Sequence, residues 1–464
     1  MDIFPKHRPV LDPGFLPAIL WNRAYRMCAE SHPAAEPLGI ALDRGDGTRS
    51  VYKTKVLPTT ESNSTLNRKY VERLLKFLLW QRGGYRVTIG GNPALATMMR
   101  EIYRPGGVRA FDCEFMGEKV YGRPMIVENC AYEALPQPRE SSIPLGRNLD
   151  GCRIGFDLGG SDRKCAALID GKVVFSEEVA WDPYFESNPQ YHFDGIHDSL
   201  QRAAAHLPHV DAIGGSSAGV YVNNEVRVAS LFRGVSKENF EQRVRGIFSD
   251  LKKQWKGIPF EVVNDGEVTA LAGSLSMGDN AVLGISMGTS LASGYVDPQG
   301  HILPWLNELA FAPIDYRDDA PVDEWSGDIG CGVQYFSQQA VARLIPQAGI
   351  SVSAGTPLAQ QLMEVQKLMK EGDQRARNIY ETIGVYFGYA VAHYVEFYEV
   401  RNLLILGRVT SGEGGKVILE KATAVLRDEF PELAQCIQLR TPNEQDKRHG
   451  QAIAAASLPK LPTL

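Results

Sequence analysis

Four times after residue 150, a short apolar run ends in glycine and small hydroxyl residues. These turns are DLGGS at 157–161, GGSSAGV at 214–220, MGTSLASG at 287–294 and GRVTSGEGG at 407–415. Helical periodicity separates or follows them, at 194–206, 236–255, 267–275 and 357–398. Short strands that alternate with helices and end in glycine turns are typical of an α/β fold.

The chain of 464 residues is too long for one typical core, so we expect more than one domain. Three prolines and paired serines interrupt the pattern at 134–151 and predict a linker. We therefore predict a domain over 1–150 and a second region over 151–464. Strand patterns at 37–43, 50–58 and 85–91, with a helix at 67–81, make the first domain α/β as well. For it we favour a scaffold or dimerisation role over a second catalytic centre.

The composition narrows the partners and the compartment. A net charge of −6 argues against a general nucleic-acid binder, because such proteins carry basic faces. Seven cysteines without a CxxC pair favour reduced thiols over a disulfide framework. No window approaches the roughly 20 apolar residues of a membrane span, and the first residues lack a signal-peptide pattern. The expected location is the cytoplasm, with no membrane partner.

Two of the glycine turns have the chemistry of a phosphate cradle. Glycines let backbone N–H groups approach phosphate oxygens, and hydroxyls add further donors. Asp157 offers a hard oxygen ligand that suits Mg²⁺, through a water molecule. An ordinary tight hairpin explains a single turn equally well, whereas two such turns favour phosphate binding. The candidate nucleotide-binding residues are Asp157, Gly159, Gly160, Ser161, Gly288, Thr289, Ser290 and Gly407.

Asp265 stands where the apolar run at 259–264 gives way to a helical pattern. One interpretation is that Asn264 or Asp265 caps the helix. The other is that Asp265 acts as a general base on a substrate hydroxyl that attacks the γ-phosphate of ATP. Both fit together, because a helix N-terminus favours a carboxylate. Lys164 is near enough in sequence to reach a phosphate, although a solvated strand lysine is the favoured interpretation. Four histidines at 192, 197, 206 and 209 lack metal-ligand spacing and favour a surface helix.

The order of these motifs resembles the superfamily of actin, sugar kinases and heat-shock ATPases (ASKHA), and within it the ROK family of sugar kinases and repressors. DLGGS resembles the first phosphate motif of that family, MGTSLASG the second, and VVNDGEVTALAG at 262–273 the segment with the catalytic aspartate. The resemblance covers about 152–460. It implies a two-lobed actin-like ATPase (ribonuclease H-like) fold behind the additional N-terminal α/β domain. It also implies ATP and Mg²⁺ as cofactors, Asp265 as the base, and an acceptor near Ser217, Gly219, Asn264 and Glu308.

The sequence also departs from the family pattern. Where ROK proteins carry a zinc-binding cysteine cluster, the stretch 323–340 holds only Cys331. One thiol cannot build a closed tetrahedral site, so we expect no structural zinc. The histidine of the sugar-binding motif is replaced by Phe311, while Glu308 is kept. The acceptor is therefore expected to be sugar-like, without a prediction of glucose.

The resemblance predicts an ATP-dependent phosphotransferase, a carbohydrate kinase that acts on a hydroxyl of a sugar or sugar-like molecule. The alternatives are a ROK-type sugar-responsive transcriptional regulator and a non-catalytic sugar-binding protein. No nucleic-acid partner is expected, and the oligomeric state stays open, with a homodimer as one option.

Overall fold

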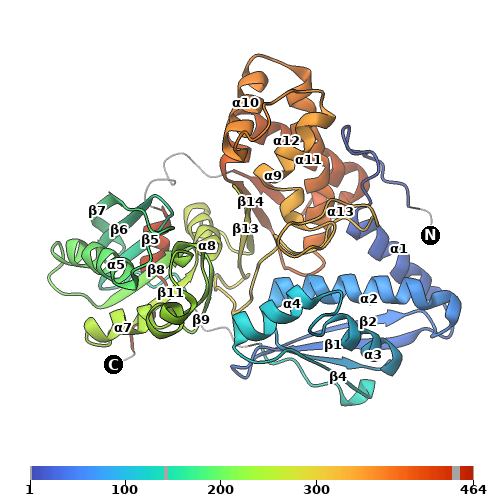
Figure 1. The fold of residues 1–464 in the computed structure, drawn as a ribbon, viewed down its shortest axis with the longest axis horizontal. Helices are drawn as coiled ribbons and strands as arrows, with labels where there is room; N and C mark the ends of the chain where they lie inside the picture. The colour runs from blue at the N-terminus through green and yellow to red at the C-terminus, as the bar shows by residue number, and fades with distance from the viewer. Residues whose placement is uncertain (1–2, 141–144, 442–449, 463–464) are drawn as a thin grey trace.

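The computed structural model describes residues 3–140, 145–441 and 450–462. Figure 1 shows two lobes side by side and a third, N-terminal unit (blue) against them. The first lobe contains 145–280 and the C-terminal helix α14 (Gly450–Ala456), and the second contains 281–441. Residues 141–144 of the predicted linker lie outside the described residues. The predicted boundary after residue 150 stays a prediction.

The first lobe is built on a five-stranded sheet in the order β11-β8-β5-β6-β7. Its strands are β5 (Cys152–Leu158), β6 (Asp162–Ile169), β7 (Lys172–Ala180), β8 (Ala212–Ser217) and β11 (Phe260–Asn264). β5, β8 and β11 are parallel, whereas β5, β6 and β7 form antiparallel pairs. Asp170 and Gly171 both have positive φ, at 47° and 77°, which confirms the tight hairpin that Asp-Gly predicts.

The run GGSS at 214–217 belongs to strand β8 and not, as the sequence suggested, to a turn. The glycines serve close packing. A Cβ on Gly214 would overlap the carbonyl oxygen of Ala455 in α14, and one on Gly155 would overlap that of Ala452. The turn proper comes at Ala218-Gly219, where Gly219 has a φ of 131°. Glycine here allows a helix to lie directly on two strands.

Helices complete the first lobe. α5 (Pro189–Ala204) confirms the helix predicted from 194, and its His192 is buried, with Nε2 within 3.1 Å of the carbonyl oxygens of Pro183 and Leu231. The surface-helix prediction was therefore wrong for His192. The pattern at 236–255 divides into α6 (Lys237–Asn239), the π-helix η4 (Phe240–Val244) and α7 (Ile247–Gln254).

The second lobe carries a sheet in the order β13-β12-β14-β15. Its strands are β12 (Val282–Met287), β13 (Leu291–Val296), β14 (Asn402–Leu406) and β15 (Gln438–Arg440). Its main helices are α9 (Gln338–Gln347), α10 (Leu358–Lys370), α11 (Gln374–Tyr394), α12 (Glu413–Glu429) and α13 (Pro431–Ala434). A β-hairpin followed by parallel strands repeats the plan of the first sheet.

Helix α8 (Asp265–Met277) joins the lobes. It begins at the end of β11 in the first lobe and packs along β13 of the second. A Cβ on Gly266 would overlap the carbonyl oxygen of Ser293, and one on Gly294 would overlap that of Gly266. Glycines on both sides thus bring the first turn of α8 against the second sheet.

The N-terminal unit has a sheet in the order β2-β1-β3-β4. Its elements are α1 (Ala18–Ser31), β1 (Glu36–Asp43), β2 (Arg49–Val56), α2 (Glu61–Arg82), β3 (Arg86–Gly90), α3 (Pro93–Ile102), α4 (Ala110–Glu114), the π-helix η1 (Phe115–Tyr121) and β4 (Ile126–Cys130). The predicted strands and the helix α2 are confirmed. In Figure 1 α2 lies on the side of this sheet that faces the second lobe.

The N-terminal unit shares its core with the second lobe. One continuous cluster of buried side chains contains Leu75 and Phe77 of α2 together with Ile383 and Phe387 of α11. The residues before α1 also lie on the second lobe, where Asp12 pairs with Arg317 at 2.8 Å and with Arg343 at 3.4 Å. No helix of the described part of the chain has the length and apolar character that a membrane span requires.

Candidate active site between the lobes

Three strand ends meet at one edge of the first sheet. Asp157 of β5 lies beside Ser216 of β8, and Ser217 lies beside Asn264 of β11. Neighbouring strands are about 4.8 Å apart, so the sheet brings together residues that the sequence separates widely. Ligands of open α/β sheets bind outside such carboxyl ends.

Asp157 is buried and oriented by its neighbours. The hydroxyl of Ser216 donates a hydrogen bond of 2.6 Å to its Oδ1. Lys164 is its partner in the antiparallel β5–β6 pair. Burial raises the pKa of Asp157, while the Ser216 hydrogen bond and the Lys164 charge lower it. Sequence reasoning missed Ser216, whose contact follows from the register between strands. The Lys164 ammonium lies 3.4 Å from Asp162, and its side chain is 37% exposed, in keeping with the strand lysine that the sequence favoured.

The first glycine turn is a tight reversal between β5 and β6. The N–H of Gly159 donates to the carbonyl oxygen of Asp162 at 2.9 Å, and the indole N–H of Trp181 donates to that of Gly159 at 2.8 Å. Gly160 lies against Tyr184, since a Cβ there would overlap the phenol ring. Ser161 is exposed. The Ser161 hydroxyl donates to Asp162 Oδ2 at 2.9 Å, so the turn has a fixed backbone, an exposed serine held by the next residue and an aromatic neighbour.

The second glycine turn joins β12 to β13. The N–H of Gly288 donates to the carbonyl oxygen of Ser290 at 2.9 Å, and Thr289 and Ser290 are both exposed. Gly407, at a φ of 99°, follows β14 and lies against the backbone of Met287, where a Cβ would come within 2.5 Å of its carbonyl oxygen. The structure thus brings the turns at 288–290 and 407 together.

Asp265 begins α8, and Asn264 caps that helix. The Asn264 Oδ1 accepts from the N–H of Gly266 at 2.7 Å, while its Nδ2 donates to the carbonyl oxygen of Gly219 at 2.6 Å. Burial, and after it the charge of Asp157, raises the pKa of Asp265 to about 6. Asp265 Oδ1 accepts from the same N–H at 3.0 Å, so Asn264 and Asp265 share the capping of α8, and this hydrogen bond lowers the pKa of Asp265 against the effect of burial.

Glu308 completes a group of interacting carboxyls. Burial and the charge of Asp265 raise its pKa to about 7. The charge of Asp157 therefore raises the pKa of Asp265, and the charge of Asp265 raises the pKa of Glu308. Carboxyls that raise one another's pKa are characteristic of functional sites, where a cation or substrate relieves the repulsion.

The two departures from the family pattern lie in contact with the N-terminal unit. Phe311 packs on Trp80 of α2, with ring centroids 4.3 Å apart. Cys331 is buried, and burial raises the pKa of its thiol to about 12. Its Sγ is 3.9 Å from Oδ2 of Asp328, which in turn pairs with Lys76 at 3.0 Å. The expectation of no structural zinc stays a prediction.

A pocket of about 190 Å³ is lined by two of the four predicted acceptor residues, Gly219 and Asn264, whereas Ser217 and Glu308 are not among its lining residues. Gly219 and Asn264 line it from the first lobe, Trp305 from the second and Tyr121 from the N-terminal unit. Sequence reasoning missed Trp305 and Tyr121, because the parts of the chain that form the pocket carry no shared motif.

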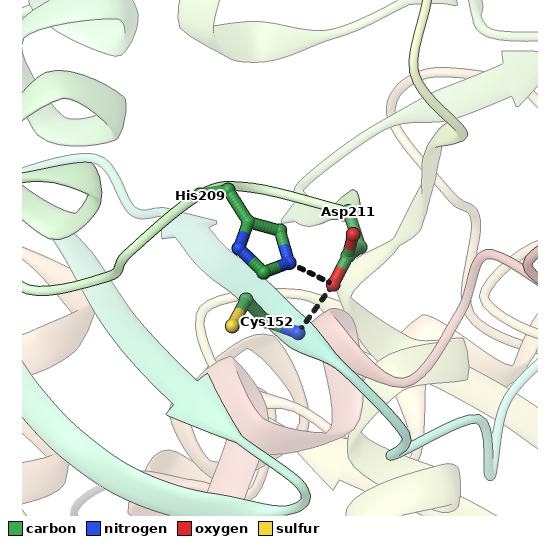
Figure 2. A group of neighbouring side chains, drawn as sticks. All are labelled: Cys152, His209 and Asp211. Atoms are coloured by element: carbon green, nitrogen blue, oxygen red, sulfur yellow. Dashed lines mark hydrogen bonds and ion pairs between the residues drawn. The ribbon is translucent and has the colours of Figure 1, made fainter.

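Cys152, His209 and Asp211 form a group of three potential metal ligands at the start of β5 (Figure 2). Asp211 Oδ2 accepts from the N–H of Cys152 at 2.8 Å and lies 3.2 Å from Nε2 of His209. Burial raises the pKa of the Cys152 thiol, which disfavours the thiolate that a metal needs. These contacts anchor the strand.

Two sheets, each with a hairpin and a glycine-rich turn, have the arrangement of an actin-like ATPase fold. No family model matches the chain, and no curated protein sequence matches it. A ROK hexokinase from Thermus thermophilus matches the structure with a TM-score of 0.51 and 18% identity, over 66% of this chain and 97% of that one. A ROK family transcriptional regulator, a homologue of the E. coli MLC protein, matches with 0.50 and 19%, over 67% and 79%. The predicted two-lobed α/β fold, the fold of ROK proteins, is confirmed.

Proposed function

We propose that this protein is an ATP-dependent carbohydrate kinase of the ROK type. The observation that carries the proposal is the carboxylate of Asp265, with its pKa raised to about 6, at the point where the two lobes meet. A base with a pKa near the working pH combines a large deprotonated fraction with useful basicity. The phosphate-type turns at 157–161 and 288–290 lie at strand ends of the two lobes.

In the proposed reaction, Asp265 accepts the proton of an acceptor hydroxyl as the hydroxyl oxygen forms a bond to the γ-phosphorus of ATP. The bond to the β,γ-bridging oxygen breaks and ADP leaves. Gly160 and Ser161 on one side, and Thr289 and Ser290 on the other, would donate N–H and hydroxyl groups to phosphate oxygens, whereas the N–H groups of Gly159 and Gly288 close their own turns. Gly407 lies against the backbone of Met287, beside the second turn, and would contact the nucleoside.

The residues around Asp157 fit a magnesium ion. The carboxylate is buried, oriented by Ser216 and close to a second carboxylate, Asp265. Both have raised pKa values, the electrostatic condition that a bound cation relieves. Mg²⁺ would be held by Asp157 through water and would neutralise charge on the β- and γ-phosphates.

The proposed acceptor lies near Ser217, Gly219, Asn264 and Glu308. The pocket beside Asn264 would hold the part of the acceptor away from the reacting hydroxyl. Its walls include the aromatic side chains of Tyr121, Tyr221 and Trp305 and also charged and amide side chains such as Arg44, Asn224 and Glu267, and small-molecule sites combine apolar walls with polar groups that fix orientation.

The test is ATP turnover with a panel of hexoses, amino sugars, sugar derivatives and polyols. We expect at least one acceptor to stimulate turnover, and Asp265→Asn to abolish this stimulation while retaining acceptor binding by calorimetry. A fully active Asp265→Asn, or a wild type that no acceptor stimulates, would refute the proposal. Metal analysis of the purified protein tests the absence of structural zinc.

A sugar-responsive regulator is the second candidate, because a ROK transcriptional regulator shares the fold. The net charge of −6 counts against it. A gel-shift assay with genomic fragments at physiological salt, with and without the sugars of the panel, distinguishes the two: specific DNA binding that a sugar alters would favour the regulator.

A further inference from the structure

Helix α2 of the N-terminal unit ends directly against the loop that carries Glu308. The N–H of Asn307 donates to the carbonyl oxygen of Gln81 at 2.8 Å, and the N–H of Glu308 donates to that of Trp80 at 2.9 Å. Gln81 and Trp80 lie in the last turn of α2, where carbonyl groups have no partner within the helix. A helix end from outside the two lobes thus supplies backbone acceptors to the candidate acceptor loop.

Asn307 is held on several sides at this point. Its φ is 51°, in the left-handed region that a non-glycine residue adopts only when its surroundings impose it. Its Nδ2 donates to Glu267 Oε1 at 2.5 Å, and its Oδ1 accepts from the hydroxyl of Tyr398 at 2.8 Å. Because Glu267 follows Asp265 in the first turn of α8, Asn307 links helix α2 to the helix that carries the candidate base.

Ring packing fixes the far side of the same loop. Phe311 lies within 4.3 Å of Trp80, 5.7 Å of Phe111 and 6.3 Å of Phe115, measured between ring centroids. Phe111 and Phe115 belong to α4 and η1 of the N-terminal unit. The loop from 307 to 311 is therefore held by backbone hydrogen bonds at one end and by an aromatic cluster at the other.

Buried ion pairs join α2 to the second lobe. The Lys76 ammonium lies 3.1 Å from Asp112 in its own unit and 3.0 Å from Asp328 in the second lobe. All three side chains are at most 3% exposed, so the charges depend on one another. The Trp80 indole N–H donates to Asp112 at 2.6 Å, which ties the last turn of α2 to the same network.

We propose that the N-terminal unit is part of the catalytic apparatus and that its helix α2 positions the Glu308 carboxyl. The residues that position the Glu308 carboxyl are Trp80 of α2 and Asn307 and Phe311 of the loop. The role of Glu308 in acceptor binding rests on the proposed function, whereas the coupling between α2 and the 307–311 loop does not.

Hydrogen–deuterium exchange of the ligand-free full chain tests the coupling. We expect Trp80→Ala to speed amide exchange in a peptide over 305–312 by about tenfold or more, because it removes the ring that packs on Phe311. Peptides over 157–161 and 287–290 should change less than about twofold. Arg104→Ala, in an exposed ion pair of the same unit, is the matched control and should change neither.

Trp80→Phe keeps a ring but loses the hydrogen bond to Asp112, and should give a smaller increase in exchange. It carries the test if Trp80→Ala does not fold. Unchanged exchange at 305–312 in these variants would overturn the proposal. So would a uniform increase across all peptides, because that reports general loosening.

Kinetics provide the functional readout. With the sugar that stimulates wild-type turnover most, Trp80→Phe should raise the acceptor KM several-fold and leave the KM for ATP unchanged. A parallel rise in both KM values would contradict selective positioning. Absence of any stimulation in the wild type would refute the kinase proposal alone, because the exchange experiment requires neither ATP nor acceptor.

Discussion

The Ser216 hydroxyl donates a hydrogen bond of 2.6 Å to Oδ1 of the buried Asp157 carboxylate. These residues are register partners on the parallel strands β5 and β8, so their contact follows from the pairing of the sheet. The hydrogen bond lowers the pKa of Asp157 and opposes the effect of burial. It orients the proposed magnesium ligand and favours its ionised form.

Removal of this hydrogen bond should weaken the magnesium site. We expect Ser216→Ala to raise the Mg²⁺ concentration for half-maximal turnover by about tenfold, the equivalent of about 1.4 kcal/mol. Titration of turnover with MgCl₂ at saturating ATP measures it. Ser187→Ala, at an exposed position, is the control; an equal Mg²⁺ requirement in both variants would contradict the role of Asp157.

The rate should depend on the ionisation of Asp265. Its pKa is raised to about 6, and the base must be deprotonated to accept a proton. Turnover should therefore increase with pH through about pH 6 and level off above about pH 7. A pH–rate profile of kcat/KM for the acceptor measures this, and a profile that falls across this range would exclude Asp265 as the base.

Asp265 should also lower stability at high pH. A carboxyl whose folded pKa lies above its unfolded value contributes stability that is lost as pH rises through the folded pKa, here about 6. Asp265→Asn should thus melt roughly 1–4 °C above wild type at pH 8, with a smaller difference at pH 5. Asp182→Asn, at an exposed position, should match wild type at both pH values. A lower melting temperature for Asp265→Asn at pH 8 would contradict this.

Gly160 leaves room for Tyr184 against the first phosphate turn. A Cβ there would overlap the phenol ring, so Gly160→Ala should raise the KM for ATP, by about tenfold. The double variant Gly160→Ala, Tyr184→Ala should recover most of the loss, because the overlapping atoms are removed. Gly246→Ala, where a Cβ meets open space, is the control. Failure of the double variant to recover would show that the clash is not the cause.

The pocket beside Asn264 should set the size of the acceptor. Val222→Trp narrows the pocket, and should raise the KM for the longest accepted sugar derivative more than for a single-ring sugar, with the KM for ATP unchanged. Val174→Trp, on a half-exposed position of β7, is the control. Equal effects on the KM values of short and long acceptors would show that the pocket does not bind the acceptor.

The sequence by itself determined the features that depend on short stretches of chain. Asp170-Gly171 specified its hairpin because its backbone conformation is a local property. The sequence also predicted the strand before Asp157 and the change from strand β11 to helix α8 at Asn264-Asp265. The sequence pattern misplaced the glycines of β8, because Gly214 makes room for α14, more than 200 residues later in the chain, and Gly215 makes room for the ring of Phe156.

Only the tertiary structure decided which neighbours act on the site. Sheet register brought Ser216 and Lys164 to Asp157, and helix α2 reached the backbone of Glu308 from a unit whose sequence carries no motif. Every residue has a backbone carbonyl group, whatever its side chain. The sequence pattern therefore does not predict which N–H groups donate to the carbonyl groups in the last turn of α2. The fold of the lobes was therefore readable from local sequence, whereas the involvement of the N-terminal unit came from long-range packing.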